Sequence, residues 1–197
     1  MDDPTFVRLI PRNSWDGASQ ALTTLRAPRW MEYYDKTTDL AHLMQQWNRA
    51  ILRAGKFLQQ MDPMNGTFTD DTGDYSPTAL VFLDFTWRLA GIRQTGDRLE
   101  WNVRPPEPTI HSSYRLNVGS TKTAELRYSS GQAELLLNEK LLYRTRDTVR
   151  LVTDVDGKIE SAVGIGRQTS HVSLQHVSGR QRKLSVEPNA SVVFPAV

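Results

Sequence analysis

The 197-residue sequence contains no cysteine. This absence excludes disulfide bonds, thiolate metal sites and a cysteine nucleophile, although a protein without cysteine can live in either redox compartment. The four histidines are scattered, and the spacing of His171 and His176 places their side chains on opposite faces of one expected strand. We therefore expect no metal site, and nothing in the sequence indicates a bound cofactor.

An excess of charge of one sign is also lacking. The formal net charge is +2, and before residue 100 the basic and acidic residues nearly balance. No basic stripe is left to bind a nucleic acid. The remaining basic residues include Arg180, Arg182 and Lys183, which we expect in a solvated hairpin turn.

Long apolar runs are missing as well. No run approaches the length of a transmembrane helix, and the residues after Met1 have neither the basic region nor the apolar core of a signal peptide. We therefore expect no membrane partner and favour a cytoplasmic location.

The two halves of the chain differ in composition. All five Trp and all five Met lie at or before Trp101, whereas the sequence from Tyr114 onward holds short alternating runs rich in Val, Leu, Ser, Thr and Arg. The prolines near residues 104–108 disfavour both helix and central strand. The sequence predicts an α+β multidomain protein with a helical part at residues 1–98 and a β part at residues 99–197.

The helical part is expected to contain three segments. The first runs from about Ala18 to about Asp35 with a kink at Pro28, and the second is an amphipathic helix from Thr37 or Thr38 to about Gln60. The third, residues 76–91, is apolar nearly all round, so other helices should cover most of its circumference. Alternating amphipathic and buried helices are typical of a double ring of helices.

The β part predicts an antiparallel β-sandwich. Val155-Asp156-Gly157-Lys158 is suited to a two-residue hairpin turn. No catalytic constellation is visible here. Ten short segments separated by turn residues are expected as strands: 99–104, 113–118, 121–128, 132–137, 140–146, 149–155, 158–165, 171–177, 183–186 and 191–194.

Three motifs of the helical part carry a resemblance. The run from Asn13-Ser14-Trp15-Asp16-Gly17-Ala18 to Trp30-Met31-Glu32-Tyr33-Tyr34 resembles the "SWRGPVW…YL…GL.RY" segment of (α/α)6-toroid glycoside hydrolases, above all the processing α-glucosidase and mannosylglycerate hydrolase group. Residues 57–66, Phe-Leu-Gln-Gln-Met-Asp-Pro-Met-Asn-Gly, resemble the "F-x-E-x-Y-[ND]-P-x-T-G" segment of that group. Residues 75–81 resemble its closing "F-x-W-T-A-A-L-V" helix.

The resemblance covers about 90 residues and implies the last helical hairpins of a partial toroid. It implies a C-terminal fragment of a glycoside hydrolase that acts on small α-linked sugars or glycosides. This chain would form one wall of the sugar pocket and carry the β part as an accessory domain. Expected partners are the carbohydrate substrate and the missing N-terminal part of the protein, or a second copy of the chain.

The resemblance also bears on catalysis. The glutamate that acts as catalytic base in the family aligns with Gln59, and an amide cannot accept a proton from water at neutral pH. The family's general acid lies in an earlier hairpin, and inverting hydrolysis needs two carboxyl groups about 6.5–9.5 Å apart. A base in this chain is therefore expected among aspartates, Asp16 or Asp74, the latter in a loop that also holds Asp70 and Asp71.

The residues expected to bind substrate are Asn13, Trp15, Gln59 and Tyr75. Trp15 can stack on a sugar ring or anchor its own loop. Asp16 can equally cap a helix, Gln59 can be satisfied locally, and Tyr75 can pack against the helix that follows it. We expect the loops at residues 12–17 and 59–75 to meet at one end of the helices.

Three functions are compatible with these residues. The first is a glycosidase whose isolated C-terminal chain is inactive. The second is a polysaccharide lyase, which uses Tyr, Asn, His or Arg instead of paired carboxylates, and the third is a non-catalytic sugar-binding or scaffold protein.

Overall fold

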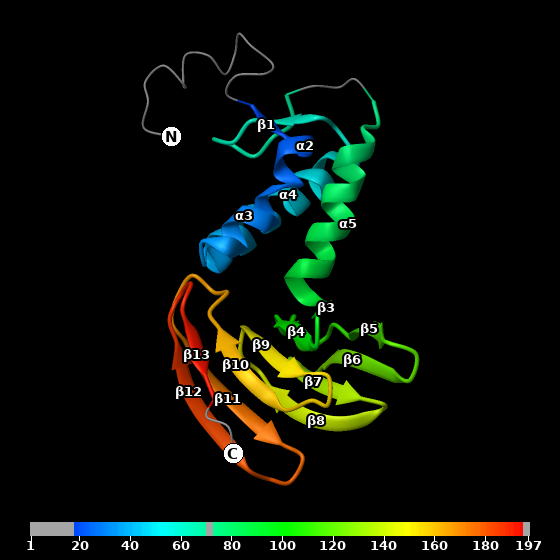
Figure 1. The fold of residues 1–197 in the computed structure, drawn as a ribbon. Coiled ribbons are helices and arrows are strands. Elements are labelled where there is room, and N and C mark those ends of the chain that lie inside the picture. Colours follow the sequence, from blue (N-terminus) through cyan, green and yellow to red (C-terminus); the bar gives the residue numbers. More distant parts are fainter. Residues whose placement is uncertain (1–17, 70–72, 195–197) are drawn as a thin grey trace. The chain divides into compact units, whose positions relative to one another are not determined.

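The computed structural model describes residues 18–69 and 73–194. Contacts within the chain divide it into two compact units. We call Met1–Tyr34 together with His42–Thr86 the helical unit, and Asp35–Ala41 together with Trp87–Val197 the β unit. Figure 1 labels the helices and strands of both units.

The first segment of the helical unit is broken into short elements. The strand β1 (Ser19–Gln20) leads into a single turn, α2 (Ala21–Thr24), and then into α3 (Ala27–Tyr33). Pro28 lies in the first turn of α3, where its missing N–H removes no helical hydrogen bond. The proline therefore begins a helix here, whereas the sequence predicted a kink within a longer one.

The helix α4 (Thr37–Ala54) is amphipathic as predicted, with Leu40, Met44 and Trp47 buried on one face. It ends before Gly55, which has a φ of +64° and donates its N–H to the Ile51 carbonyl at 2.9 Å. A glycine in this left-handed conformation ends many helices. The chain then reaches β2 (Gln60–Met61), so the helix is shorter than the sequence predicted.

The helix α5 (Ser76–Ala90) buries Thr78, Val81 and Phe85 but leaves Leu80 55% and Leu83 65% exposed. Other residues therefore cover only one face of this apolar helix. Among the described residues, no helix is long and apolar enough to cross a membrane.

The predicted partial toroid of helical hairpins is wrong. The structure is 40% strand and 25% helix, with three sheets and only three helices beyond the single turn α2 in the described residues. The physical reason lies in α5, because the apolar circumference of a helix shows what it can bury and not whether other helices surround it.

The predicted antiparallel sandwich is present in the β unit. Its two sheets share one core, and Figure 1 shows β9 and β10 facing β8 and β11. The five-stranded sheet has the order β13 (Ser191–Val193), β10 (Ile159–Val163), β9 (Val149–Asp154), β4 (Arg98–Val103), β3 (Ile92–Thr95). The six-stranded sheet has the order β12 (Gln181–Val186), β11 (Ser170–His176), β8 (Lys140–Thr145), β7 (Gln132–Leu137), β6 (Lys122–Ser129), β5 (Ser112–Val118).

Alternation along the strands sorts the side chains of the β unit. Leu126 and Leu135, paired across β6 and β7, are fully buried between the sheets. The next pair of the ladder, Arg127 and Glu134, points to the opposite face. The largest core side chain, Trp101, donates its indole N–H to the Thr153 hydroxyl at 3.0 Å, so even its polar atom is satisfied.

Tyr128 connects the core to the chain around the prolines. Its buried hydroxyl accepts the Arg104 amide at 3.1 Å and lies 3.1 Å from the Asn102 carbonyl. Burial raises the pKa of the Tyr128 hydroxyl and lowers the pKa of the Arg104 guanidinium to about 10. The guanidinium donates to the Ile165 carbonyl at 2.8 Å.

Hydrogen bonds to Gly164 and Asn189 connect the first turn of α4 to the β unit. The Thr37 and Thr38 hydroxyls both donate to the Gly164 carbonyl, at 3.0 and 3.1 Å. The Thr38 amide donates to Asn189 Oδ1 at 2.7 Å, and the Asn189 amide returns a bond to the Thr38 hydroxyl at 3.1 Å. Gly164 cannot be another residue without movement, because a Cβ there would collide with the Glu187 carbonyl.

Candidate functional site

Some of the site residues predicted from the sequence lie outside the described residues. Those outside the described residues are Asn13, Trp15 and Asp16, together with the loop aspartates Asp70 and Asp71. Those in the helical unit that the structure describes are Gln59, Asp74 and Tyr75.

The stretch Phe57–Met61 is bonded to two other segments of the helical unit. The predicted meeting with residues 12–17 lies outside the described residues. The strand β1 pairs with β2 so that Gln20 lies opposite Gln60, and the Ala21 amide donates to the Gln59 carbonyl at 3.2 Å. On the other side, the Tyr75 amide donates to the Phe57 carbonyl at 2.6 Å. Gln20 and Ala21, which lie within the first motif, and Tyr75, the first residue of the third, are thus all bonded to the second motif.

The same stretch is bonded to the start of α5. The Thr78 side chain is fully buried and its hydroxyl donates to the Leu58 carbonyl at 2.5 Å. The rings of Phe57 and Phe82 lie 6.2 Å apart between centroids. These contacts fix the position of Gln59 relative to the helix that carries Tyr75 at its entry.

The hairpin after β2 is held by its own side chains. Asp62 accepts the Met64 amide at 2.8 Å and the Asn65 side-chain amide at 2.7 Å. Asn65 Oδ1 in turn accepts the Thr67 amide at 2.9 Å, and Gly66 takes a φ of +68°. Asp62 and Asn65 therefore shape the turn, as the Asx chemistry of this sequence indicates.

A buried aromatic side chain, that of Trp47, packs against Phe68 at the end of this hairpin. The Trp47 side chain is inaccessible and packs edge-to-face on Phe68, with ring centroids 5.9 Å apart. Its indole N–H has no hydrogen-bond partner among the described residues, and the buried Asn48 Oδ1 has none either. Such atoms are uncommon in a closed core, because each leaves a desolvation cost of about 1–3 kcal/mol uncompensated.

The described site residues offer neutral hydrogen-bonding groups and one carboxylate. Gln59 and Tyr75 are half-buried, and Asp74 is exposed. An amide and a phenol can donate to and accept from hydroxyl groups. Gln59 cannot act as a base, so these residues are chemically equipped for binding.

No group of three or more His, Asp or Glu that could hold a metal ion occurs in residues 18–69 and 73–194. The histidines of β11 show the reason. His171 and His176 lie in one strand five residues apart, and each has its own serine partner, Ser185 and Ser178 respectively.

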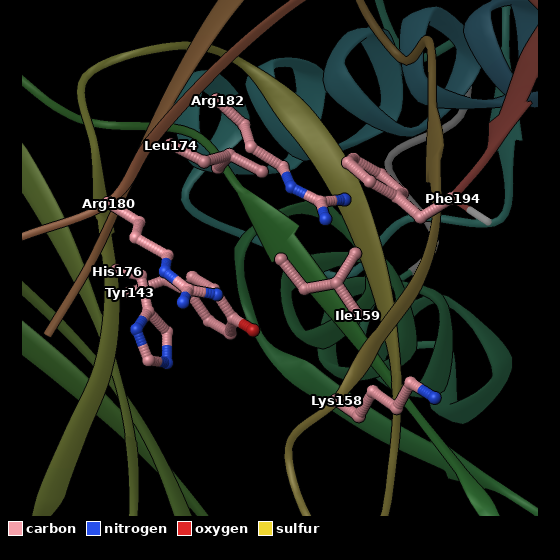
Figure 2. A pocket seen from close by; sticks show the side chains of 8 residues that line it. All are labelled: Tyr143, Lys158, Ile159, Leu174, His176, Arg180, Arg182 and Phe194. Atoms are coloured by element: carbon pink, nitrogen blue, oxygen red, sulfur yellow. The ribbon is translucent and has the colours of Figure 1, made fainter. Parts of the chain in front are cut away.

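One cluster of the β unit was not predicted from the sequence as a site. Arg180 and Arg182, expected in a solvated turn, line a cavity between the two sheets together with Tyr143 and Phe194 (Figure 2). The turn ends before β12, so Arg182 lies in the strand. The sequence holds one signal for the position of Arg182. Arg182 precedes Leu184 by two residues and Val186 by four, so all three side chains lie on one face of the strand.

Comparison of the chain with models of protein families, with curated proteins and with solved structures finds no significant match.

Proposed function

We propose that this chain takes part in binding a glycoside through the loops that meet at Phe57–Met61. The observation that carries the proposal is the set of main-chain bonds around this stretch. The Ala21 amide, in the first motif, bonds to the Gln59 carbonyl, and the Tyr75 amide, at the start of the third motif, bonds to the Phe57 carbonyl. Gln59 and Phe57 both belong to the second motif. These are the three segments that resemble glycoside hydrolases.

The side chains support binding of a neutral, hydroxyl-rich ligand. Gln59 and Tyr75 extend from two segments bonded to each other through Phe57, and both carry groups that can donate and accept. Sugar sites combine a few such polar groups with apolar or aromatic surface. Trp15, in the first motif, is the aromatic residue that we expect to stack on the sugar ring, and it lies outside the described residues.

Cleavage of a glycoside needs groups that Gln59 does not provide. Hydrolysis of a small α-linked glycoside requires a general acid and a base or nucleophile at a defined separation. Loss of a positioned acid or base typically lowers the rate by about 10²–10⁴. We therefore propose binding without turnover for the 197-residue chain.

Ligand-detected NMR with methyl α-glucoside and methyl α-mannoside tests this proposal on the full chain. At least one of the two should bind, and Gln59→Ala and Tyr75→Phe should each weaken binding by about 1–3 kcal/mol, as expected for a lost hydrogen bond to the ligand. No reducing sugar should be released from α-glucosides or α-mannosides.

Gln46→Ala is the matched control, because Gln46 is an exposed glutamine on α4 outside the site. It should leave binding unchanged. The proposal fails if neither glycoside binds, or if Gln59→Ala and Tyr75→Phe both bind as the wild type does. Hydrolysis that disappears on replacing one of the chain's own carboxylates would contradict binding without turnover.

A further inference from the structure

A cavity of about 210 Å³ lies between the two sheets of the β unit, on the side of the edge strands β12 and β13. Both sheets contribute to its walls, as Figure 2 shows. The six-stranded sheet and its β11–β12 turn supply Tyr143, Leu174, His176, Arg180 and Arg182. The five-stranded sheet and its adjoining residues supply Lys158, Ile159 and Phe194.

Arg182 occupies a strand position whose side chain points to the same side as the core residues. In β12, Val186 and Leu184 pack on the core, and Arg182 continues the same alternation. In β11 the inward positions are Val172 and Leu174, and Leu174 lies directly opposite Arg182. The apolar inner face of the sandwich thus becomes cationic at this side.

These cations have no carboxylate partner. Among the described residues, none of Lys158, Arg180 and Arg182 makes an ion pair. On the outer face of the same sheet, by contrast, Arg144 pairs with Glu134 at 2.9 Å. The three cations are exposed, so salt screens their charges, but together they line one cavity beside apolar and aromatic side chains and attract an anion to it.

Asp154 is an acidic group close enough to Tyr143 to raise the pKa of its hydroxyl slightly, after the larger effect of burial. Its Oδ1 is already used in the β9–β10 turn, where it accepts the amides of Asp156 and Lys158, both at 2.9 Å. Asp154 Oδ1 is therefore used within the turn, and among the described residues Asp154 makes no ion pair with Arg180 or Arg182.

Aromatic rings complete the lining. The Arg182 guanidinium lies over the Phe194 ring, 5.3 Å from its centroid, and the Tyr143 and His176 rings lie 5.1 Å apart. Stacking orients a guanidinium while its N–H edge stays free for a carboxylate or phosphate. The Tyr143 hydroxyl is protonated at neutral pH and can donate a hydrogen bond, and burial raises its pKa further.

We propose that this cavity binds a small anionic ligand: a carboxylate or phosphate carried on a single ring with an apolar face. Arg180 and Arg182 hold the anionic group, and Phe194 and Tyr143 flank the ring. The cavity has room for about seven waters at about 30 Å³ each, and it is smaller than the roughly 300–1,000 Å³ of sites for larger ligands. A sugar acid and a sugar phosphate share this chemistry.

Titration calorimetry of the full chain at low ionic strength tests the proposal with four probes: glucuronate, glucose 6-phosphate, neutral glucose and inorganic phosphate. At least one of the two ring anions should bind about tenfold or more tighter than glucose and tighter than inorganic phosphate. The preferred one identifies carboxylate or phosphate as the anionic group. Added salt should weaken binding, because the attraction is partly electrostatic.

The arginine variants localise the site. Arg182→Gln and Arg180→Gln should each weaken binding of the preferred anion about tenfold or more. Lys183→Gln is the matched control, because Lys183 is exposed like Arg182, lies on the opposite face of β12, does not line the cavity and loses the same charge. It should change the affinity less than about threefold, and all three variants should keep the wild-type circular dichroism spectrum.

Three outcomes would overturn the proposal. Binding of neither ring anion more tightly than glucose removes the anion site. An equal loss in Lys183→Gln and Arg182→Gln shows that diffuse surface charge, and not the cavity, attracts the ligand. Inorganic phosphate that binds as tightly as both ring anions removes the role of the aromatic lining.

Discussion

The β unit and the helical unit bury their apolar residues to different extents. In the β unit, side chains of both sheets meet in one continuous core that includes Trp101 and Leu126. In the helical unit, Trp30, Leu80 and Leu83 are each more than half exposed. Two alternating sheets can cover each other completely, whereas a helix that is apolar nearly all round needs several neighbours.

Two buried tryptophans show the same difference at the level of single atoms. Trp101 in the β unit and Trp47 in the helical unit are both inaccessible to solvent. The Trp101 indole N–H is bonded to Thr153, while the Trp47 indole N–H has no partner among residues 18–69 and 73–194. The buried Arg104 Nε of the β unit also has no partner among the described residues, so the difference between the units rests mainly on the exposed side chains of the helical unit. Those side chains are apolar surface through which the helical unit can associate.

The largest expected effect is that of Trp101→Ala. Removing this side chain opens a cavity in the closed core and leaves the Thr153 hydroxyl without its indole donor. We expect a loss of about 3–5 kcal/mol in the free energy of unfolding, measured by urea denaturation. Trp30→Ala should change it by less than about 0.5 kcal/mol, because Trp30 is exposed. Equal losses in the two variants would break the comparison.

Tyr128→Phe should have an intermediate effect. The variant leaves the Arg104 amide without its acceptor, which should cost about 1–3 kcal/mol at neutral pH. Equilibrium denaturation of both proteins measures the difference. A loss below about 0.3 kcal/mol would show that water or another group replaces the hydroxyl.

The Tyr128 contribution should also depend on pH. Burial raises the pKa of the folded-state hydroxyl above its ordinary value, so the folded protein retains a proton that the unfolded chain releases above a pH of about 10. The stabilisation is fully present below that pH. The difference between wild type and Tyr128→Phe should therefore shrink by about 1.4 kcal/mol per pH unit above it. A constant difference from pH 7 to pH 11 would contradict this assignment.

The smallest effect on stability is expected at the exposed face of α5. The double variant Leu80→Gln, Leu83→Gln should change the free energy of unfolding by less than about 0.5 kcal/mol, because neither side chain is buried. It should reduce self-association, measured by sedimentation velocity over a range of concentrations. A wild-type chain that is monomeric throughout, with no dye-accessible apolar surface, would contradict the difference between the units.

Much of the β unit could be predicted from the sequence. Alternation in residues 132–137 gives β7 with its observed bounds. The strand β3, residues 92–95, was missed because four residues between a helix and a turn are too few to establish a period. The Asp-Gly turn was predicted in the right place but is longer, because the Asp154 side chain binds the amides of Asp156 and Lys158.

The helical part shows where sequence patterns stop being informative. The pattern of α5 gives its apolar circumference, but a toroid depends on other helices whose presence no local period encodes. The Asp62–Gly66 turn, by contrast, follows from local chemistry, because Asp62 and Asn65 bond to nearby groups of the same turn. The pairing of Tyr75 with Phe57 could not be predicted from the sequence, because only the fold specifies it. The expected meeting of the loops at residues 12–17 and 59–75 stays a prediction, because residues 12–17 lie outside the described part of the chain.

Hydrogen exchange of the full chain, resolved by peptide, tests the difference between the two units most directly. Amides of the interior strands β6 and β7 in the β unit should open only through the main unfolding reaction and exchange most slowly. Amides of α3 and of α5 up to Thr86 in the helical unit should exchange at least about tenfold faster, because their apolar residues are only partly covered. Protection of α3 and α5 equal to that of β6 and β7 would show that the helical unit is as completely packed as the β unit.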